Sequence, residues 1–279
     1  METRIGSCFL GRTLELSNGK IVVGVTLDVG PRIIKLQKPD GENLMFEDVA
    51  DNVNKDVSAV YGEGKKWHIY GGHRIWLSPE SLETYYPDNA PVVSELKPNG
   101  AVFTPPAWTE RGVQPVLDLE FAPDGALEVR MRVKNISDVK QKLCVWGLTV
   151  MKCGGTLTLP LSTEDTGFLA NRNLVLWHYT DIRDPRLTIA NDRIILTGST
   201  DAESPLKIGT YLNEIRAFYR YGDTLFTKEC ISKPGEYPDF TCNFETYTSE
   251  LIHECETLSA AEEVAPGEEI IHTEKWRLE

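Results

Sequence analysis

The sequence predicts an all-β protein made of two packed antiparallel sheets, large enough to curve around a concave face. Asn-Gly or Asp-Gly recurs between β-rich runs, and such dipeptides supply the positive φ angles of tight hairpins. Several runs alternate apolar and polar residues, and helical periodicity is nearly absent. The four dipeptides are Asn18-Gly19, Asp40-Gly41, Asn99-Gly100 and Asp124-Gly125.

The clearest hairpin surrounds Asp124-Gly125. Its arms, 116–121 and 127–133, alternate apolar and charged residues with period two. One face of the hairpin is therefore expected to be buried and the other exposed to solvent. Further strands are expected, in chain order, at 20–27, 32–36, 142–150, 193–197, 215–221, 224–230, 244–248, 250–257 and 269–278. The best helical segments are 47–54 and 79–85, the latter with Ser78 as the cap and Pro79 at the first position.

Composition favours one domain over residues 1–279 and limits the possible partners. The chain is 41% hydrophobic, enough for a large core, and it shows no repeat or linker. Its formal charge of −13 repels phosphate backbones and anionic bilayers, so no nucleic-acid or membrane partner is expected. The sequence does not indicate an oligomeric state.

Several other functions lack their sequence signals. The start of the chain has no signal-peptide pattern, so we expect a cytoplasmic protein with reduced cysteines. The six cysteines have no CxxC or paired-histidine spacing, so no metal is expected. Residues 62–66 lack the spacing of a phosphate-binding loop, GxSxG and HExxH are missing, and no cofactor is expected.

Residues 71–80 read GGHRIWLSPE and gather polar groups after a glycine-rich turn. Trp76 can stack on a sugar face, Arg74 and Glu80 can hydrogen-bond hydroxyl groups, and His73 can move a proton. A packed strand with an Arg–Glu ion pair is the alternative, and the segment alone does not decide between them.

A second polar concentration lies at 243–257 and contributes Asn243 and Glu245. Along 252–256, period-two alternation places Glu254 and Glu256 on one face and the residues between them on the other. An exposed acidic strand is the simpler interpretation. On a concave face, however, burial and mutual repulsion would raise a carboxyl pKa and suit that group to general-base catalysis.

Two lysines, Lys207 and Lys228, alternate with apolar residues. We expect such lysines to point to solvent, although either could project into a cleft and bind an acidic group on a ligand.

The chain resembles the galactose mutarotase-like superfamily and, within it, the DUF4380 type of protein. The resemblance spans most of the chain and depends on the joint order of its motifs. These are GGHRIWLSPE (71–80), WGLTVM (146–151) with Gly154-Gly155, NFETY (243–247), ECETL (254–258), and PGE (266–268) with HTEKWRL (272–278).

The resemblance implies a β-supersandwich whose concave face binds a monosaccharide or oligosaccharide. In aldose 1-epimerases of this superfamily, a glutamate deprotonates the anomeric hydroxyl and a histidine protonates the ring oxygen. Glu254 is similar in position to that glutamate, Glu256 to a neighbouring ligand contact, and His73-Arg74 resembles the pair that holds the sugar.

One departure leaves the reaction open. Family members carry a histidine shortly after the Leu-Thr of the central strand, where this chain continues to Met151. His73 is the leading substitute acid, with His68 and His178 as the other imidazoles. The sequence therefore leaves three hypotheses: an aldose 1-epimerase-like isomerase, a sugar-binding or sensing protein without the acid, and a hydrolase or lyase using Glu80 and Glu254.

Overall fold

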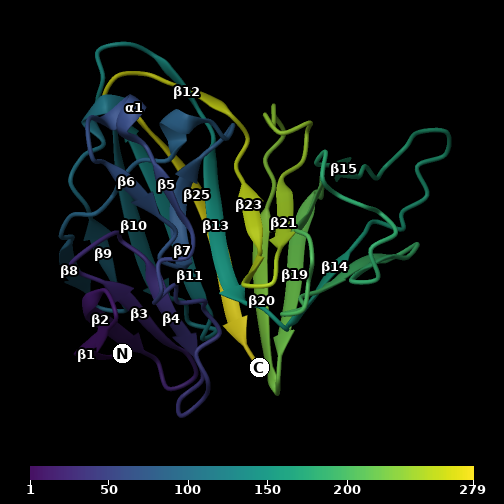
Figure 1. Ribbon diagram of the computed structural model, residues 1–279, viewed down its shortest axis with the longest axis horizontal. Helices are drawn as coiled ribbons and strands as arrows, with labels where there is room; N and C mark the ends of the chain where they lie inside the picture. The colour runs from purple at the N-terminus through teal and green to yellow at the C-terminus, as the bar shows by residue number, and fades with distance from the viewer.

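A computed structural model describes residues 1–279 and contains two large sheets, here called sheet I and sheet II (Figure 1). All strand pairs in both sheets are antiparallel. The eleven strands of sheet I, in spatial order, are β1 (Glu2–Cys8), β2 (Gly11–Ser17), β3 (Val22–Thr26), β4 (Ile33–Gln37), β7 (Gly72–Leu77), β13 (Val145–Lys152), β22 (Ile252–Glu254), β21 (Phe244–Thr248), β18 (Leu206–Thr210) and β15 (Val175–Leu176), with β23 (Glu256–Leu258) pairing β13 and β21.

Sheet II has ten strands, and two small ribbons complete the structure. Sheet II runs β16 (Leu187–Ile189), β17 (Arg193–Thr197), β14 (Thr156–Pro160), β19 (Glu214–Tyr221), β20 (Thr224–Ile231), β25 (Glu269–Leu278), β11 (Leu127–Asn135), β10 (Val113–Phe121), β9 (Gly100–Thr104) and β8 (Val93–Lys97). The ribbons are β12 (Gln141–Leu143) with β24 (Glu262–Val264), and β5 (Asn54–Asp56) with β6 (Lys66–His68).

Helix is confined to short turns. They are α1 (Ser58–Tyr61) and the 3₁₀ turns η1 (Leu82–Thr84) and η2 (Thr109–Arg111). None of these helices is long or apolar enough to cross a membrane.

Sheet I is covered on both faces, and this positions the site. A cluster of 45 buried apolar residues fills the space between the sheets. A second cluster of 13, which includes Trp67, Trp76 and Trp146, packs on the other face of sheet I. Every residue of β7 and β18 is consequently buried. We call this second face of sheet I the outer face.

The predicted all-β architecture is confirmed, and most expected strands are present. Three expected ranges coincide with β17, β21 and β25. Two others, 142–150 and 250–257, are each split in the structure, at Cys144 and Cys255. The hairpin turn at Asp124-Gly125 joins β10 to β11, with Gly125 at φ 83°.

Both helix predictions were wrong. Residues 47–54 form turns and isolated bridges, and only the 3₁₀ turn η1 occurs within 79–85. Ser78 does not cap a helix, because its hydroxyl donates to Asp239 Oδ2 at 2.7 Å. Instead, the Ser81 N–H donates to Thr84 Oγ1 at 3.2 Å and begins the short turn.

Candidate functional site

Register along the centre of sheet I brings the predicted polar residues onto its outer face. Trp76 pairs with Trp146, and Arg74 pairs with Leu148. On the next strands, Glu256 pairs with Glu245. Because side chains alternate along a strand, these residues project to the same side, away from sheet II.

A cavity of about 290 Å³ lies on this outer face, close to the lower limit of roughly 300 Å³ for ligand pockets. Aromatic rings and carboxylates dominate its wall. The aromatic residues are Trp67, Trp76, Tyr85, Trp146, Tyr179 and Tyr247, and the charged residues are Lys55, Glu80, Lys207, Glu254 and Glu256. Five predicted site residues (Trp76, Glu80, Lys207, Glu254 and Glu256) therefore line one cavity.

Lys207 is the central cation of the cavity. Its ammonium group lies 2.6 Å from Glu245 Oε2 and 3.7 Å from Glu256 Oε2. It also lies between two indole rings, 4.7 Å from the centroid of Trp146 and 4.6 Å from that of Trp177. Burial lowers its pKa, but Glu256 and Glu245 outweigh this effect and raise the pKa well above the usual value. Lys207 is therefore cationic, contrary to the expectation that it faces solvent.

The two carboxyl groups are buried rather than exposed. Glu254 is 8% exposed, Glu256 is fully buried, and neither oxygen of Glu256 has a hydrogen-bond partner in the protein. Burial raises the pKa of Glu254 to about 7, with Lys207 opposing the shift and Glu80 adding to it. Burial also raises the pKa of Glu256 well above its usual value, again against Lys207. Near neutral pH Glu254 can therefore hold or release a proton, whereas burial favours the protonated form of Glu256 in the free protein.

The raised pKa of Glu254 predicts a pH-dependent stability. A carboxyl with a pKa near 7 in the folded state and about 4.3 in the unfolded state binds more protons when folded, so stability falls as pH rises between these values. Lys207, Glu80, Glu245, Tyr85 and Tyr247 surround this group.

Between about pH 4.5 and 7, we expect the unfolding free energy of the wild type to fall by up to roughly 3 kcal/mol relative to that of Glu254→Gln. Urea unfolding of both proteins across this range measures the difference. Glu250→Gln, an exposed change in the preceding turn, serves as the control. Parallel curves for wild type and Glu254→Gln would contradict the assignment.

Arg74 supports the aromatic wall without lining the cavity. Its guanidinium lies 4.3 Å from the ring centroid of Trp76 and 5.3 Å from that of Trp67. Asp88, 3.9 Å away, is already held by Arg32 through contacts of 2.5 and 2.8 Å. None of the three Arg74 nitrogens has a hydrogen-bond partner, and burial, aided by Arg32, lowers the pKa to about 9. The alternative Arg74–Glu80 ion pair does not form.

Glu80 and Lys55 stand at the exposed rim. The Tyr85 hydroxyl donates to Glu80 Oε1, and the Lys55 ammonium lies 3.9 Å from the centroid of the same Tyr85 ring. Tyr85 in turn packs edge-on against Trp76, with centroids 4.8 Å apart. The rim thus combines one carboxylate and one ammonium group around a fixed aromatic ring.

His73 lies on the opposite face of β7, between the two sheets. It is fully buried, its Nδ1 is 2.8 Å from Thr149 Oγ1, and its ring packs edge-on against Trp276. Burial, reinforced by Lys228, lowers its pKa well below the usual value. Its role as proton donor stays a prediction that this geometry does not support.

Lys228 also lies between the sheets, and not at the surface as its alternation suggested. Its ammonium donates to Thr149 Oγ1 at 2.5 Å, to the Cys255 carbonyl at 2.8 Å and to Glu274 Oε1 at 3.1 Å. Cys255 lies between the end of β22 and the start of β23, and thus between the two cavity glutamates in the sequence. Lys228 therefore contacts the backbone that carries Glu254 and Glu256 but does not line the cavity.

The two remaining predicted site residues, Glu245 and Asn243, contact other groups of the protein. Glu245 is buried beside the cavity as the partner of Lys207. The Asn243 side chain accepts from the Leu212 N–H at 2.9 Å and donates to the Leu212 carbonyl at 2.8 Å, which binds it to the chain instead of a ligand.

None of the five histidines lines the cavity. His68 Nδ1 lies 2.6 Å from Asp51 Oδ1, and His178 is exposed. No group of three or more His, Cys, Asp or Glu residues is arranged to hold a metal ion.

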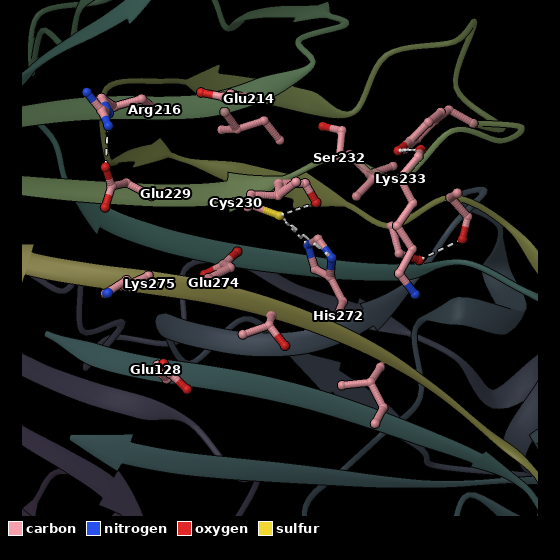
Figure 2. Close-up of a pocket in the computed structure, with 18 residues that line it drawn as sticks. Glu128, Glu214, Arg216, Glu229, Cys230, Ser232, Lys233, His272, Glu274 and Lys275 are labelled. Carbon is pink, nitrogen blue, oxygen red and sulfur yellow. Dashed lines mark hydrogen bonds and ion pairs between the residues drawn. The ribbon is translucent and has the colours of Figure 1, made fainter. Parts of the chain in front are cut away.

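A larger cavity of about 490 Å³ lies elsewhere, where β20 and β25 separate in sheet II. Figure 2 shows Cys230 and His272 pointing toward each other there, with Sγ 3.9 Å from Nε2. Burial raises the pKa of Cys230 to about 12 and lowers that of His272 to about 3. The pair is thus a neutral thiol beside a neutral imidazole, and no predicted site residue lines this cavity.

Six of the aromatic and charged wall residues were not among the predicted site residues: Lys55, Trp67, Tyr85, Trp146, Tyr179 and Tyr247. Tyr247 had a usable signal, because it lies two residues from Glu245 and alternation puts both on one face. Trp67 and Tyr179 come from segments that cross the outer face, and no local pattern indicates where such segments lie.

The two packed antiparallel sheets match the galactose mutarotase-like fold, a β-supersandwich, as predicted. Among solved structures, the chain is similar to a galactose mutarotase-like protein from Clostridium acetobutylicum, with a TM-score of 0.62, 11% identity, and coverage of 100% of this chain and 98% of the other. It is also similar to a galactose mutarotase-like protein from Lactobacillus casei, with a TM-score of 0.59, 12% identity and coverage of 96% and 100%.

A candidate aldose 1-epimerase from Escherichia coli K12 is also similar, with a TM-score of 0.55, 10% identity, and coverage of 100% of this chain and 99% of the other. At these identities the similarity establishes the fold alone. No protein-family model and no curated protein sequence matches the chain.

Proposed function

We propose that the protein binds a monosaccharide in the outer-face cavity and interconverts its anomers, as an aldose 1-epimerase-like isomerase. The observation that carries the proposal is the pair of buried carboxyl groups, Glu254 and Glu256, in a cavity walled by tryptophan and tyrosine. Aromatic faces bind the apolar faces of sugar rings, and carboxyl oxygens bind hydroxyl groups. The fold shared with the structures above supports the same class of ligand.

Glu254 can supply both the acid and the base of anomer exchange. With a pKa of about 7, a large fraction of its carboxyl groups carries a proton near neutral pH. One carboxyl oxygen donates that proton to the ring oxygen while the other accepts the proton of the anomeric hydroxyl. The bond from C1 to the ring oxygen breaks, a C1 carbonyl forms, and the carboxyl group ends with its proton on the other oxygen.

The reverse transfer, after rotation about the C1–C2 bond, closes the ring with the opposite configuration at C1. The carboxyl group then returns to its starting state, so no net proton is consumed. This scheme needs no histidine at the cavity. It therefore fits a wall that contains carboxyl groups and no imidazole.

Exchange spectroscopy tests the proposal. For a panel of aldohexoses, aldopentoses and hexosamines, we expect the purified protein to accelerate exchange between α and β anomer signals over buffer. Saturation-transfer experiments on the same samples report binding. Neither acceleration nor binding for any member of the panel would overturn the proposal.

Tyr179→Ala is expected to weaken sugar binding about 2- to 12-fold, since one aromatic contact contributes about 0.5–1.5 kcal/mol. Tyr179 is half-buried in the cavity wall and comes from the segment that follows β15. Titration calorimetry measures the change in Kd. Arg183→Ala, an exposed change four residues further along the same segment, is the control and should bind as the wild type does. Equal weakening by both variants would count against the assigned wall.

A second candidate function is sugar binding without catalysis. The position of His73 favours binding without catalysis, because the His73 imidazole faces the space between the sheets and not the cavity. Binding with no acceleration of anomer exchange would select this candidate over the isomerase.

A further inference from the structure

The carboxyl groups around the cavity outnumber the ammonium groups. Its wall contains three carboxyl groups, from Glu80, Glu254 and Glu256, and two ammonium groups, from Lys55 and Lys207. Glu245 lies immediately behind the wall and binds Lys207 at 2.6 Å. Counting Glu245, four carboxyl groups face two ammonium groups.

Glu256 is the wall carboxyl whose two oxygens are both buried, and it shares its one cation, Lys207, with Glu245. It is fully buried, and neither carboxyl oxygen has a hydrogen-bond partner. The nearest ammonium, that of Lys207, is 3.7 Å from Oε2 and lies closer to Glu245. A buried carboxylate in this situation must take up a proton or bind a donor from outside the chain.

The other buried cations cannot serve Glu256. Arg74 packs against Trp67 and Trp76, and Asp88 is its one carboxylate neighbour within 4 Å. Lys228 is on the far side of sheet I with Glu274. The missing positive charge therefore has to come from a ligand or a proton.

The aromatic wall is suited to an ammonium ion. The protein already places two of its own ammonium groups on rings here, Lys207 between Trp146 and Trp177 and Lys55 over Tyr85. Cations are attracted to the faces of such rings, and the attraction is strongest where water is excluded. An ammonium ion on a ligand would meet the same rings together with the Glu256 carboxylate.

We propose that the ligand of this cavity is an amino sugar with a free, positively charged amine, and that its ammonium group binds Glu256. This inference rests on the proposed sugar-binding function and specifies its substrate class. One carboxyl group then recognises the amine while the other acts at the anomeric centre.

Matched pairs of sugars test this inference. We expect calorimetric titration to give a Kd about tenfold or more lower for glucosamine than for glucose, and likewise for galactosamine over galactose. N-acetylglucosamine, which has no charge, should bind no better than glucose. A hexose that binds as tightly as its hexosamine would overturn the inference and leave the sugar-binding function standing, whereas binding of none of these sugars would overturn both.

The variant Glu256→Gln locates the effect. It should reduce the hexosamine preference to about threefold or less while hexose binding persists, and Glu263→Gln, an exposed change on β24, should keep the full preference. A full preference in Glu256→Gln would assign the amine to another carboxylate and overturn the role of Glu256. The comparison of sugars on the wild type remains decisive if Glu256→Gln does not fold.

Discussion

Glu254→Gln is expected to lower the rate of anomer exchange by about 10²–10⁴-fold, the usual contribution of general acid–base catalysis. The amide matches the carboxyl in shape but is a far poorer proton donor and acceptor. Binding should change little, because the aromatic wall and Glu256 remain. Exchange spectroscopy on wild type and variant at pH 7 measures the loss.

The pH profile separates this role from a structural one. The proposed transfer starts from the protonated carboxyl, so the wild-type rate should fall as pH rises through about 7. Glu250→Gln, in the exposed turn before β22, should retain both rate and profile. A Glu254→Gln protein that keeps at least half of the wild-type rate would eliminate Glu254 as the catalytic group.

Lys228→Met is expected to cost about 3–5 kcal/mol of unfolding free energy, the usual result of removing one partner from a buried ion pair. The ammonium is buried and bonded to Thr149, Glu274 and the Cys255 carbonyl. Methionine fills much of the volume but leaves the Glu274 carboxylate without a cation. Urea unfolding monitored by circular dichroism measures the change.

Lys233→Met provides the comparison for this prediction. Lys233 also pairs with a glutamate, Glu262, at 3.1 Å, but both side chains are largely exposed. Its loss should cost at most about 1 kcal/mol. Similar effects of the two substitutions would contradict the buried-pair interpretation, and Lys228→Met/Glu274→Gln should recover part of the loss.

Strands with one solvent-exposed face give the clearest sequence signal, although β13, buried along most of its length, was also predicted and the alternating β14 was not. Alternation marks β11, and β25 carries the same pattern of buried and exposed residues along its length. The strands β7 and β18 are buried along both faces because aromatic segments cover the outer face of sheet I. The alternation around Lys207 was interpreted as that of a lysine pointing to solvent, β18 was not among the expected strands, and the start of β7 was interpreted as a turn.

The site was predictable where it depends on the alternation of side chains between the two faces of a strand. Glu254 and Glu256 lie two residues apart and share a face, as expected. Alternation also separates His73 from Arg74, so the two could not both face the cavity along one strand. The burial of Lys207 could not be predicted, because its partners Glu245 and Glu256 lie on other strands and Trp177 on a separate segment.

The distribution of tryptophan makes the cavity its own optical reporter. Four of the six tryptophans, Trp67, Trp76, Trp146 and Trp177, line the cavity or contact Lys207 within it. Intrinsic fluorescence therefore originates mainly around the candidate site. A ligand that displaces water from these indoles changes the emission directly, so unlabelled compounds can be screened by fluorescence titration before the reaction is known.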